Sequence, residues 1–379
     1  MKKVLILSYS YMDRDPRVLR QIAFFESKQF EVYLSSLSYT GNHQFIPLLK
    51  VKKGLAQKFL KAILFLFRIN RFRLSNFLKN SNVESLNNKV DLVVANDIET
   101  WPIAIRLKSK NKNIKVVFDA HEYYPRHFED VLMWRILHQS FYLYLCNKFI
   151  HKADVFMTVC KGIGEEYKKN FNTEYLLVYN APDFEPELWP NEIDANHIKL
   201  IHHGNANPSR KIESMINLMK YLDKRFHLYL MLMPTDKGYL AELKKIASKF
   251  DNVTFLDPVP TQEIPRFINK FDMGVFLLDP VNFNYEHALP NKFFEFMQAR
   301  LGIAIGPSKE MKYILEEQQL GVVSEDFGEA SLAKKINSLQ IDDLIEFKWN
   351  AHKCAQEYSN EGNKRVYEGI IENFKAFRK

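Results

Sequence analysis

The sequence predicts an α/β protein made of two doubly wound domains in tandem. Short apolar runs alternate with longer helical patterns in both halves of the chain, which is the pattern of parallel strands joined by crossover helices. A polar stretch with three prolines, 181–197, interrupts this alternation once, and the pattern then restarts. The length of 379 residues, 46% of them hydrophobic, also favours two domains of about 100–200 residues each.

The first half contains six predicted strands and four predicted helices. The strands cover 4–8, 32–37, 92–96, 116–120, 155–159 and 175–180, and the helices cover 16–28, 55–78, 102–110 and 131–152. Pro16 can open the first helix and Asp15 can cap it, because the first helical N–H groups have no partner within the helix. We expect residues 1–182 to form the N-terminal domain and 183–197 to form a linker.

The second half contains five predicted strands and four predicted helices. The strands cover 199–204, 227–233, 253–257, 273–278 and 302–306, and the helices cover 211–222, 238–249, 262–269 and 291–299. We expect the C-terminal domain to span 198–354, and a helix within 355–379 to pack back on the N-terminal domain. Ligands of doubly wound sheets bind beyond the carboxyl ends of the strands, so the loops that follow strands are the candidate sites.

Composition excludes several other classes of protein. Cys146, Cys160 and Cys354 are scattered and form no CxxC pair, which argues against a disulfide framework or a zinc ribbon and favours a reducing compartment. The N-terminal MKKVLIL has too few apolar residues for a signal peptide and predicts a first strand. The longest wholly apolar run, 62–67, is far shorter than the roughly 18 residues of a membrane-spanning helix. We expect a soluble or peripheral intracellular protein.

Positive charge is concentrated in 32–83, which contains no Asp or Glu, while the whole chain carries a net charge of +8. Within it, 55–78 mixes cations with large apolar residues, and a basic amphipathic helix of this kind is typical of membrane-surface contact. The alternative is a core helix with a solvated basic face, and nucleic acid is less favoured because no binding motif accompanies the charge. The residues expected to contact an anionic membrane are Lys58, Lys61, Arg68, Arg71 and Arg73.

A candidate phosphate site follows the strand 199–204. Gly204 permits close approach of the backbone to a ligand, and Arg210 and Lys211 stand at the start of the next predicted helix. A helix N-terminus with free N–H groups and two cations attracts phosphate. The alternative is a loop whose two solvated cations begin a surface helix, and no GxGxxG or Walker pattern is present.

A second candidate lies in LPNKFFEF, where a helix is predicted soon after a strand ends. Asn291, Lys292 and the N-terminal amides could hold a phosphate oxygen, and Glu295, one turn further on, could accept hydrogen bonds from paired hydroxyls. The alternative is ordinary capping with Glu295 opposing the helix dipole. Lys292 has the wrong charge for that alternative, because cations are unfavourable at a helix N-terminus.

In the first half, DAHEYYP follows a predicted strand and carries Asp119, His121 and Glu122. His121 at a strand end could hydrogen-bond a polar substrate, and the alternative is a histidine that caps a turn. The motif lacks the second histidine of a zinc helix, so no metal site is predicted. Asp15 lies in a DxD pattern, but its capping position explains it equally well.

Five motifs in order resemble glycosyltransferase family 4, whose members have the GT-B fold: DRDPRVLRQ, DAHEYYP, NAPD, HHGNANPSRKIE and LPNKFFEFMQARLGIAI. The resemblance implies two Rossmann-like domains that face each other across a cleft. The second would hold a UDP-sugar or GDP-sugar donor and the first an acceptor. It also implies catalysis without a cofactor or a bound metal.

The resemblance assigns donor-binding roles in the second domain. Arg210 and, beside it, Lys211 would contact the donor diphosphate. Asn291 and Lys292 match the PNK form that some members carry in this loop. Glu295 would match the second Glu of the family's Glu-x7-Glu element, which holds the ribose.

The sugar and the acceptor are assigned in the same way. His121 would match the catalytic histidine near the donor sugar. Where the family has its first Glu this sequence has His287, with Glu286 adjacent, and we expect one of the two to act at the sugar. Asp15 and Arg17, in the first motif, are expected on the acceptor side.

The activity implied is retaining transfer of a sugar to a glycan or a lipid-linked acceptor, in the synthesis of a bacterial surface polysaccharide or glycoconjugate. It would take place on the inner face of the cell membrane. Two alternatives remain open. One is a nucleotide-sugar epimerase of the same fold, and the other is a non-catalytic protein that binds a nucleotide sugar or a glycan.

Overall fold

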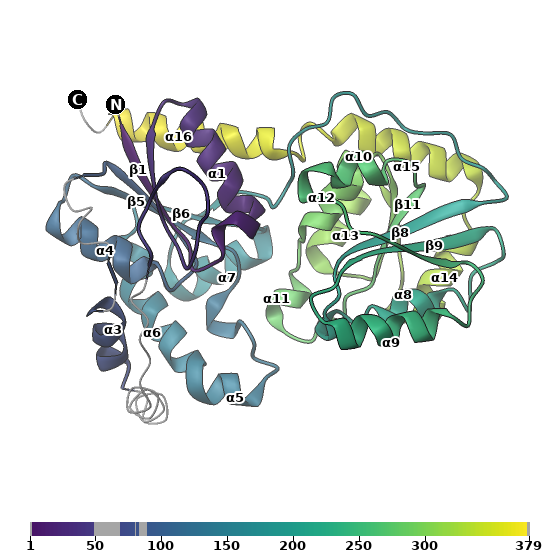
Figure 1. Ribbon diagram of the computed structural model, residues 1–379, viewed down its shortest axis with the longest axis horizontal. Coiled ribbons are helices and arrows are strands. Elements are labelled where there is room, and N and C mark those ends of the chain that lie inside the picture. The colour runs from purple at the N-terminus through teal and green to yellow at the C-terminus, as the bar shows by residue number, and fades with distance from the viewer. Residues whose placement is uncertain (1, 49–68, 80, 83–88, 377–379) are drawn as a thin grey trace. The chain divides into compact units, whose positions relative to one another are not determined.

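The computed structural model describes residues 2–48, 69–79, 81–82 and 89–376. The chain divides into two compact units, each built on its own parallel sheet (Figure 1). Unit 1 comprises Met1–Val178, Asn282–Asn284 and Lys364–Lys379, and unit 2 comprises Tyr179–Val281 and Tyr285–Asn363. The predicted fold class, α/β with two doubly wound sheets, is confirmed.

The sheet of unit 1 has seven strands in the order β3-β2-β1-β4-β5-β6-β7, and every pair is parallel. The direction of winding reverses between β1 and β4, which is where ligands of such sheets bind, beyond the carboxyl ends of the strands. The strands are β1 (Lys3–Leu7), β2 (Glu31–Ser35), β3 (Gln44–Phe45), β4 (Leu92–Asn96), β5 (Lys115–Ala120), β6 (Val155–Thr158) and β7 (Leu176–Leu177).

Helices cover the sheet of unit 1. Asp15 accepts a hydrogen bond from Val18 N and Pro16 occupies the first helical position, so α1 begins where the sequence predicts. The helices are α1 (Pro16–Ser27), α3 (Asn70–Lys79), α4 (Trp101–Lys110), α5 (Leu132–Trp134), α6 (Ser140–Phe149), α7 (Lys161–Phe171) and α16 (Asn360–Ala376). Single turns are η1 (Met12–Arg14), η3 (Tyr124–Arg126), η5 (Ile150–Lys152) and the π-helical η4 (Arg135–Gln139).

Unit 2 has a six-stranded parallel sheet in the order β10-β9-β8-β11-β12-β13. Its winding reverses between β8 and β11, so the loops beyond these two strands are the expected ligand positions. The strands are β8 (Ile198–Asn205), β9 (Phe226–Met233), β10 (Val253–Leu256), β11 (Met273–Phe276), β12 (Gly302–Ile305) and β13 (Gly321–Val323). β3 and β13 are the described strands that the sequence did not predict.

The helices of unit 2 include α12, which packs tightly on β11. A Cβ added at Gly274 of β11 would lie 2.4 Å from the Phe296 ring of α12, so only glycine allows this approach. The helices are α8 (Glu213–Leu218), α9 (Lys237–Ala247), α10 (Ile264–Ile268), α11 (Phe283–Glu286), α12 (Asn291–Gln298), α13 (Lys309–Glu317), α14 (Glu329–Asn337) and α15 (Ile341–Cys354), with single turns η6 (Pro208–Arg210) and η7 (Thr261–Glu263).

The predicted linker, 183–197, is instead part of unit 2. Arg300, which is buried, donates a 2.7 Å hydrogen bond to the carbonyl of Glu185, and the Trp189 ring stacks on His352 at 4.5 Å. The stretch lacks regular structure because its prolines prevent helix and sheet hydrogen bonding, yet its backbone is held by side chains of the unit.

The C-terminal helix α16 begins in unit 2, and from Lys364 its residues belong to unit 1. Tyr367, Ile370 and Ile371 are buried in the same apolar cluster as residues of α1 and β1. Tyr367 also shares a 3.2 Å hydrogen bond with Gln21 of α1. The core of unit 1 is therefore assembled from both ends of the chain.

Candidate functional site

A half-buried lysine lies in the first turn of α12 in unit 2. Lys292 Nζ is 3.3 Å from His202 Nε2 and 4.3 Å from the centroid of the Phe276 ring. Burial, with the charge of Arg210, lowers the pKa of Lys292 to about 7, and Glu295 only partly opposes this shift. Elements β8, β11 and α12 thus hold an amine that is poorly stabilised as a cation, at the strand ends where the winding reverses.

Gly204, near the end of β8, lies directly beside this amine. Its φ of +128° is a conformation that side chains disfavour, and an added Cβ would stand 3.4 Å from Lys292 Nζ. The structure therefore brings Gly204 and Lys292 together, while the close approach of the Gly204 backbone to a ligand stays a prediction.

Glu295 lies one turn further along α12 and is also buried. Its Oε2 is 3.5 Å from Nε2 of His203. Burial and the charge of Lys292 lower the pKa of His203 well below the ordinary value, so this ring is neutral. Sequence reasoning missed His202 and His203, although two adjacent histidines in an otherwise apolar strand were the available signal.

Arg210 and Lys211 differ in their surroundings. The Arg210 guanidinium lies 4.6 Å from the centroid of the Tyr285 ring, and Ser209 Oγ is 3.1 Å from the Tyr285 hydroxyl. Lys211 has a φ of +45° and its Nζ pairs with Asp279 Oδ2 at 2.5 Å. The structure therefore keeps Arg210 near the end of β8 but gives the Lys211 charge a carboxylate of its own.

The predicted helix start at Lys211 is wrong. Residues 208–210 form a single 3₁₀ turn, and α8 begins only at Glu213. The positive φ of Lys211 ends that turn, because a left-handed residue cannot continue a helix. The two cations thus precede the helix, and α8 with six residues is too short to supply the expected anion site at its N-terminus.

Three further predicted residues lie around α11 and α12. Asn291 is the first residue of α12. His287 Nδ1 is 2.9 Å from Glu310 Oε1, and Glu286 Oε1 is 2.7 Å from Lys309 Nζ. Both of these side chains pair with the first turn of α13, so their role at a sugar stays a prediction.

In unit 1, His121 follows β5 with both ring nitrogens facing oxygen atoms. Nε2 is 3.2 Å from Asn96 Oδ1, and Nδ1 is 3.5 Å from Asp97 Oδ1. Asn96 Nδ2 donates to the Leu7 carbonyl, which identifies Oδ1 as the acceptor atom. Burial alone would lower the pKa of His121, but Asp119 and Asp97 raise it above its ordinary value. The two carboxylates thus favour the protonated form of the ring.

Asp97 follows directly after β4, at the point where the winding of the sheet reverses. Its φ of +65° is strained for a residue other than glycine, which typically costs about 1–3 kcal/mol. Its carboxylate accepts hydrogen bonds from Tyr9 N at 3.1 Å and Ser8 Oγ at 3.3 Å, both just beyond β1. Sequence reasoning missed Asp97, because an aspartate after a strand looks like an ordinary turn residue.

More titratable groups lie close by in unit 1. The Tyr142 hydroxyl donates to Glu99, and burial with the charge of Asp97 raises the pKa of Glu99. His127 Nε2 is 2.6 Å from Glu122 Oε2. A half-buried group of carboxylates and hydrogen-bond donors therefore lies beyond the ends of β4 and β5, and such groups suit hydroxyl-rich ligands.

Asp15 and Arg17 serve unit 1 itself. Asp15 caps α1, and the buried Arg17 guanidinium donates to both carboxylate oxygens of Asp119 at 2.8 and 2.6 Å and to the Val178 carbonyl at 2.7 Å. Arg17 is therefore buried and bonded within unit 1, and its role at an acceptor stays a prediction. The role of Asp15 at an acceptor stays a prediction.

No protein-family model matches the sequence, and no curated protein matches it significantly. Solved structures match it closely in fold. Sucrose-phosphate synthase from Thermosynechococcus elongatus has a TM-score of 0.73 at 11% identity, over 99% of this chain and 100% of that one. Anabaena Alr3699/HepE, solved with UDP and glucose, has a TM-score of 0.69 at 14% identity over 98% and 100%. WaaG, a glycosyltransferase involved in lipopolysaccharide biosynthesis, has 0.62 at 13% over 96% and 99%.

The chain has the GT-B fold. In each GT-B sheet the groups described above follow the carboxyl ends of the strands. Among the described residues, no group of three or more His, Cys, Asp or Glu side chains is placed to hold a metal ion. The side chains gathered beside β8 and α12 are Lys292, the neutral His202 and His203, and the carboxylate of Glu295.

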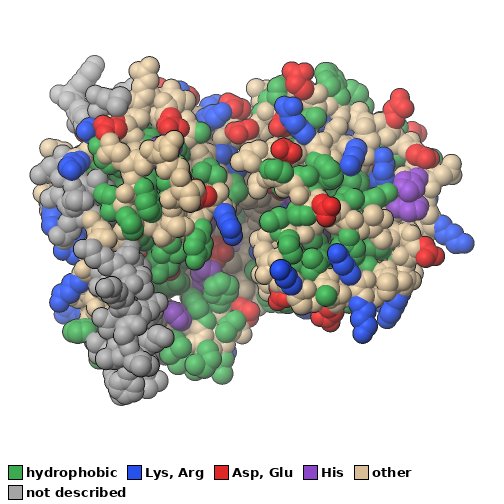
Figure 2. All heavy atoms as spheres, in the orientation of Figure 1, with side chains coloured by type: hydrophobic (Ala, Val, Ile, Leu, Met, Phe, Trp, Pro, Cys, Tyr) green, Lys and Arg blue, Asp and Glu red, His purple; other side chains and the backbone are tan. Residues whose placement is uncertain are grey.

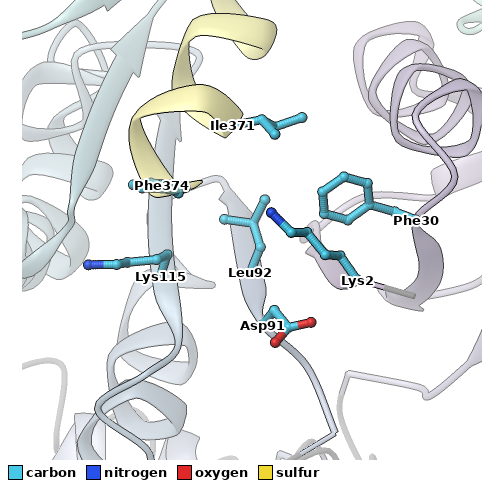
Figure 3. Close-up of a pocket in the computed structure, with 7 residues that line it drawn as sticks. All are labelled: Lys2, Phe30, Asp91, Leu92, Lys115, Ile371 and Phe374. Atoms are coloured by element: carbon cyan, nitrogen blue, oxygen red, sulfur yellow. The ribbon is translucent and has the colours of Figure 1, made fainter. Parts of the chain in front are cut away.

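Two cavities lie elsewhere in the GT-B units. One, of about 30 Å³, is lined by Lys2, Phe30, Asp91, Leu92, Lys115, Ile371 and Phe374. Figure 3 shows Ile371 and Phe374 of α16 near Leu92, at the amino ends of the strands, opposite to the expected ligand edge. The other, of about 400 Å³ in unit 2, is lined by Glu213, Asp236 and Glu242 among others, and these carboxylates do not suit a diphosphate.

The residues expected to contact a membrane differ in whether the structure describes them and in how exposed they are. Lys58, Lys61 and Arg68 lie outside the described residues. Arg71 is exposed on α3. Arg73 is buried: its guanidinium lies 4.0 Å from the centroid of the Phe141 ring, and burial lowers its pKa to about 10. Arg73 therefore joins α3 to α6 and does not face outwards, which corrects that prediction.

Proposed function

We propose that the protein is a glycosyltransferase that moves a sugar from a nucleoside-diphosphate sugar to a glycan or a lipid-linked acceptor. The observation that carries this proposal is the half-buried Lys292 beside Gly204, with Arg210 as a second cation. An amine held at neutral pH close to losing its proton is stabilised when an anion binds. Structures of HepE, which has the same fold, contain UDP or UDP-glucose, and this supports a diphosphate as that anion.

The chemistry follows from these side chains. Lys292 and Arg210 would stabilise the nucleoside diphosphate as negative charge develops on it during transfer. Glu295, which lies 3.5 Å from His203, would accept hydrogen bonds from the ribose hydroxyls. UDP and GDP are the candidate leaving groups, and the site contains enough positive charge for either.

The acceptor would bind beyond the ends of β4 and β5 of unit 1. There His121, whose ring nitrogens face Asn96 and Asp97, would orient oxygen atoms of the substrates. The retaining outcome is proposed on the resemblance to the family alone. Assignment to family 4 and to surface polysaccharide synthesis rests on the sequence motifs.

A specific observation favours a second candidate, a non-catalytic protein that binds a nucleotide sugar. His287 stands where the family has its first Glu, and it pairs with Glu310 of α13. Glu286 pairs with Lys309 of the same helix. If neither side chain reaches the sugar, the protein would bind the donor without turning it over.

We also propose peripheral attachment to the cytoplasmic face of an anionic membrane through 50–79. None of the described helices is long and apolar enough to cross a membrane. On α3, Arg71 and Phe72 are exposed, and residues 131–153 contain no acid. Hydrophobic side chains gather over α5 and α6 (Figure 2), and the exposed ones are Val131, Leu132, Met133, Ile136 and Leu143. Apolar exposure with positive charge favours a lipid surface.

The decisive experiment separates the two candidate functions. Thermal shift with UDP, GDP and their sugars should show stabilisation of about 2.7 kcal/mol at 100 times the dissociation constant. Release of nucleoside diphosphate is then measured with and without a glycan acceptor. Binding with release supports the transferase, and binding without release supports the non-catalytic protein. Absence of binding by UDP, by GDP and by their sugars overturns both candidate functions.

A further inference from the structure

The hydrogen bonds of His202 define its tautomer. Its Nδ1 is 2.9 Å from the carbonyl oxygen of Val275 in β11, and a carbonyl can only accept. Nδ1 must therefore carry the proton. Burial and the charge of Lys292 lower the pKa of His202 well below the ordinary value, so the ring is neutral. Nε2 then presents a lone pair.

That lone pair faces Lys292. The 3.3 Å separation between His202 Nε2 and Lys292 Nζ is a hydrogen-bond distance, and only the lysine has protons to donate. His202 is 1% exposed, so the ring is fixed by its surroundings and cannot turn away without breaking its bond to Val275. The backbone of β11 thus sets the direction of the lysine amine.

The charged and titratable groups around Lys292 come from β8, η6 and α12. β8 contributes the neutral His202 and His203, and β11 contributes only the Phe276 ring. Arg210 of η6 disfavours the ammonium form, and Glu295 of α12 favours it. In the free protein these effects leave the amine divided between its protonated and neutral forms near neutral pH.

We propose that His202 is a positioning residue that holds the Lys292 amine at the N-terminus of α12. When a nucleoside diphosphate binds there, Lys292 takes up one proton from solvent. This rests on the proposed function, since it takes the diphosphate as the ligand. The proton passes from buffer to Nζ, the resulting ammonium donates to a phosphate oxygen and to His202 Nε2, and no covalent bond is broken. Donor binding is thereby coupled to protonation of a single side chain.

The first test uses the free protein. The Lys292 side-chain carbon signals are titrated by NMR in the wild type, with assignment from Lys292→Arg. In His202→Phe the ammonium loses its acceptor, so the titration midpoint should fall by about one to two pH units, the size of a hydrogen bond to a charged group. His202→Gln, which keeps an acceptor, should restore part of the shift. An unchanged midpoint in His202→Phe overturns the positioning role.

The second test uses UDP. Calorimetry at pH 8 in two buffers with different ionisation enthalpies gives the number of protons taken up. The wild type should take up close to one and Lys292→Arg close to none, because arginine is already charged. His227→Gln is the matched control, a histidine of the neighbouring strand β9 stacked on His197, and should behave as wild type. UDP binding without proton uptake in the wild type overturns the coupling.

The two tests also distinguish this proposal from the proposed function. If UDP does not bind but the midpoint still shifts in His202→Phe, the positioning of Lys292 by His202 stands and the diphosphate site does not. If UDP binds and the midpoint does not shift, the donor site stands and His202 has no positioning role.

Discussion

The Arg17 guanidinium and the Asp119 carboxylate form a buried ion pair with two hydrogen bonds, which ties α1 to β5 in unit 1. Gln21 Nε2 adds a third bond to Asp119 at 2.8 Å. Burial would raise the pKa of Asp119, but the charge of Arg17 and the contact with His121 hold it well below the ordinary value. The pair therefore stabilises unit 1 above the ordinary carboxyl pKa, and that stability is lost as the pH falls through the lowered value.

Removal of one partner of the Arg17–Asp119 ion pair should destabilise the protein. We expect Arg17→Met to lower the free energy of unfolding by about 3–5 kcal/mol, because Asp119 would remain buried and charged without its partner. Urea denaturation followed by circular dichroism measures the loss. The double variant Arg17→Met/Asp119→Leu should recover part of it, and an Arg17→Met variant as stable as wild type would contradict the assignment.

The two adjacent cations of unit 2 should respond differently to truncation. Arg210→Ala should weaken UDP binding about 10- to 150-fold, the effect of losing a hydrogen bond between charged groups. Lys211→Ala should change affinity little, because the Lys211 ammonium already pairs with Asp279 on the exposed surface. Calorimetry measures both. Equal losses in the two variants would show that Lys211 also contacts the diphosphate.

Glu295→Ala should also weaken UDP binding about 10- to 150-fold while the protein stays folded. The physical reason is the loss of a buried carboxylate that would accept hydrogen bonds from the ribose hydroxyls. The informative comparison is with 2′-deoxy-UDP, which lacks one ribose hydroxyl. The wild type should distinguish UDP from this analogue, and Glu295→Ala should not. A variant that keeps the discrimination would remove the ribose role.

His121 is expected to affect turnover more than donor affinity. His121→Ala should lower kcat about 100-fold at saturating donor, in the range found when an oriented hydrogen-bond donor or charge is removed. Asp97→Asn should lower the pKa of His121, because Asp97 contributes to raising it. The stabilising contribution of the imidazolium is present below about pH 6.5 and is lost as the pH rises through the raised pKa. NMR titration of His121 in both proteins checks this, and an unchanged midpoint would mean that Asp97 has no such effect.

Membrane attachment is tested by co-sedimentation with liposomes of varied anionic-lipid content. A variant with Lys58, Lys61, Arg68 and Arg71 changed to Gln should bind less, and salt should weaken wild-type binding because charges are screened beyond about 8 Å at physiological ionic strength. Leu132→Gln/Met133→Gln should lower the part of binding that salt leaves, since both side chains are more than half exposed. Tyr313→Gln, on an exposed face of unit 2, is the control. Liposome binding that does not depend on the anionic-lipid content would contradict the proposal.

Every predicted strand is present, because each is an uninterrupted apolar run between turn residues. β3 and β13 have two and three residues, too few to form a pattern. α12 was predictable to within one residue from Pro290 and its apolar face. The single long helix expected over 131–152 is interrupted by the π-helical η4, which leaves no signal in the apolar spacing.

The site was only partly predictable, for physical reasons. Lys292 and Glu295 could be singled out because their charges conflict with an apolar helix start. The two adjacent histidines of β8 were a visible signal, but the hydrogen bond of His202 to Val275, 73 residues away in sequence, was not predictable. Arg73 was misplaced for the same reason: its partner Phe141 lies on α6, and charge pattern alone does not show which face of a helix packs.

The burial of Tyr367, Ile370 and Ile371 of α16 in the core of unit 1 has a consequence for synthesis on the ribosome. All seven strands of that unit are translated by Val178, but these three apolar side chains of α16 are translated only after 179–363. At about 5–20 residues per second the wait is on the order of 10–40 s. During that interval the nascent unit exposes the apolar surface near α1 and β1 that α16 later covers.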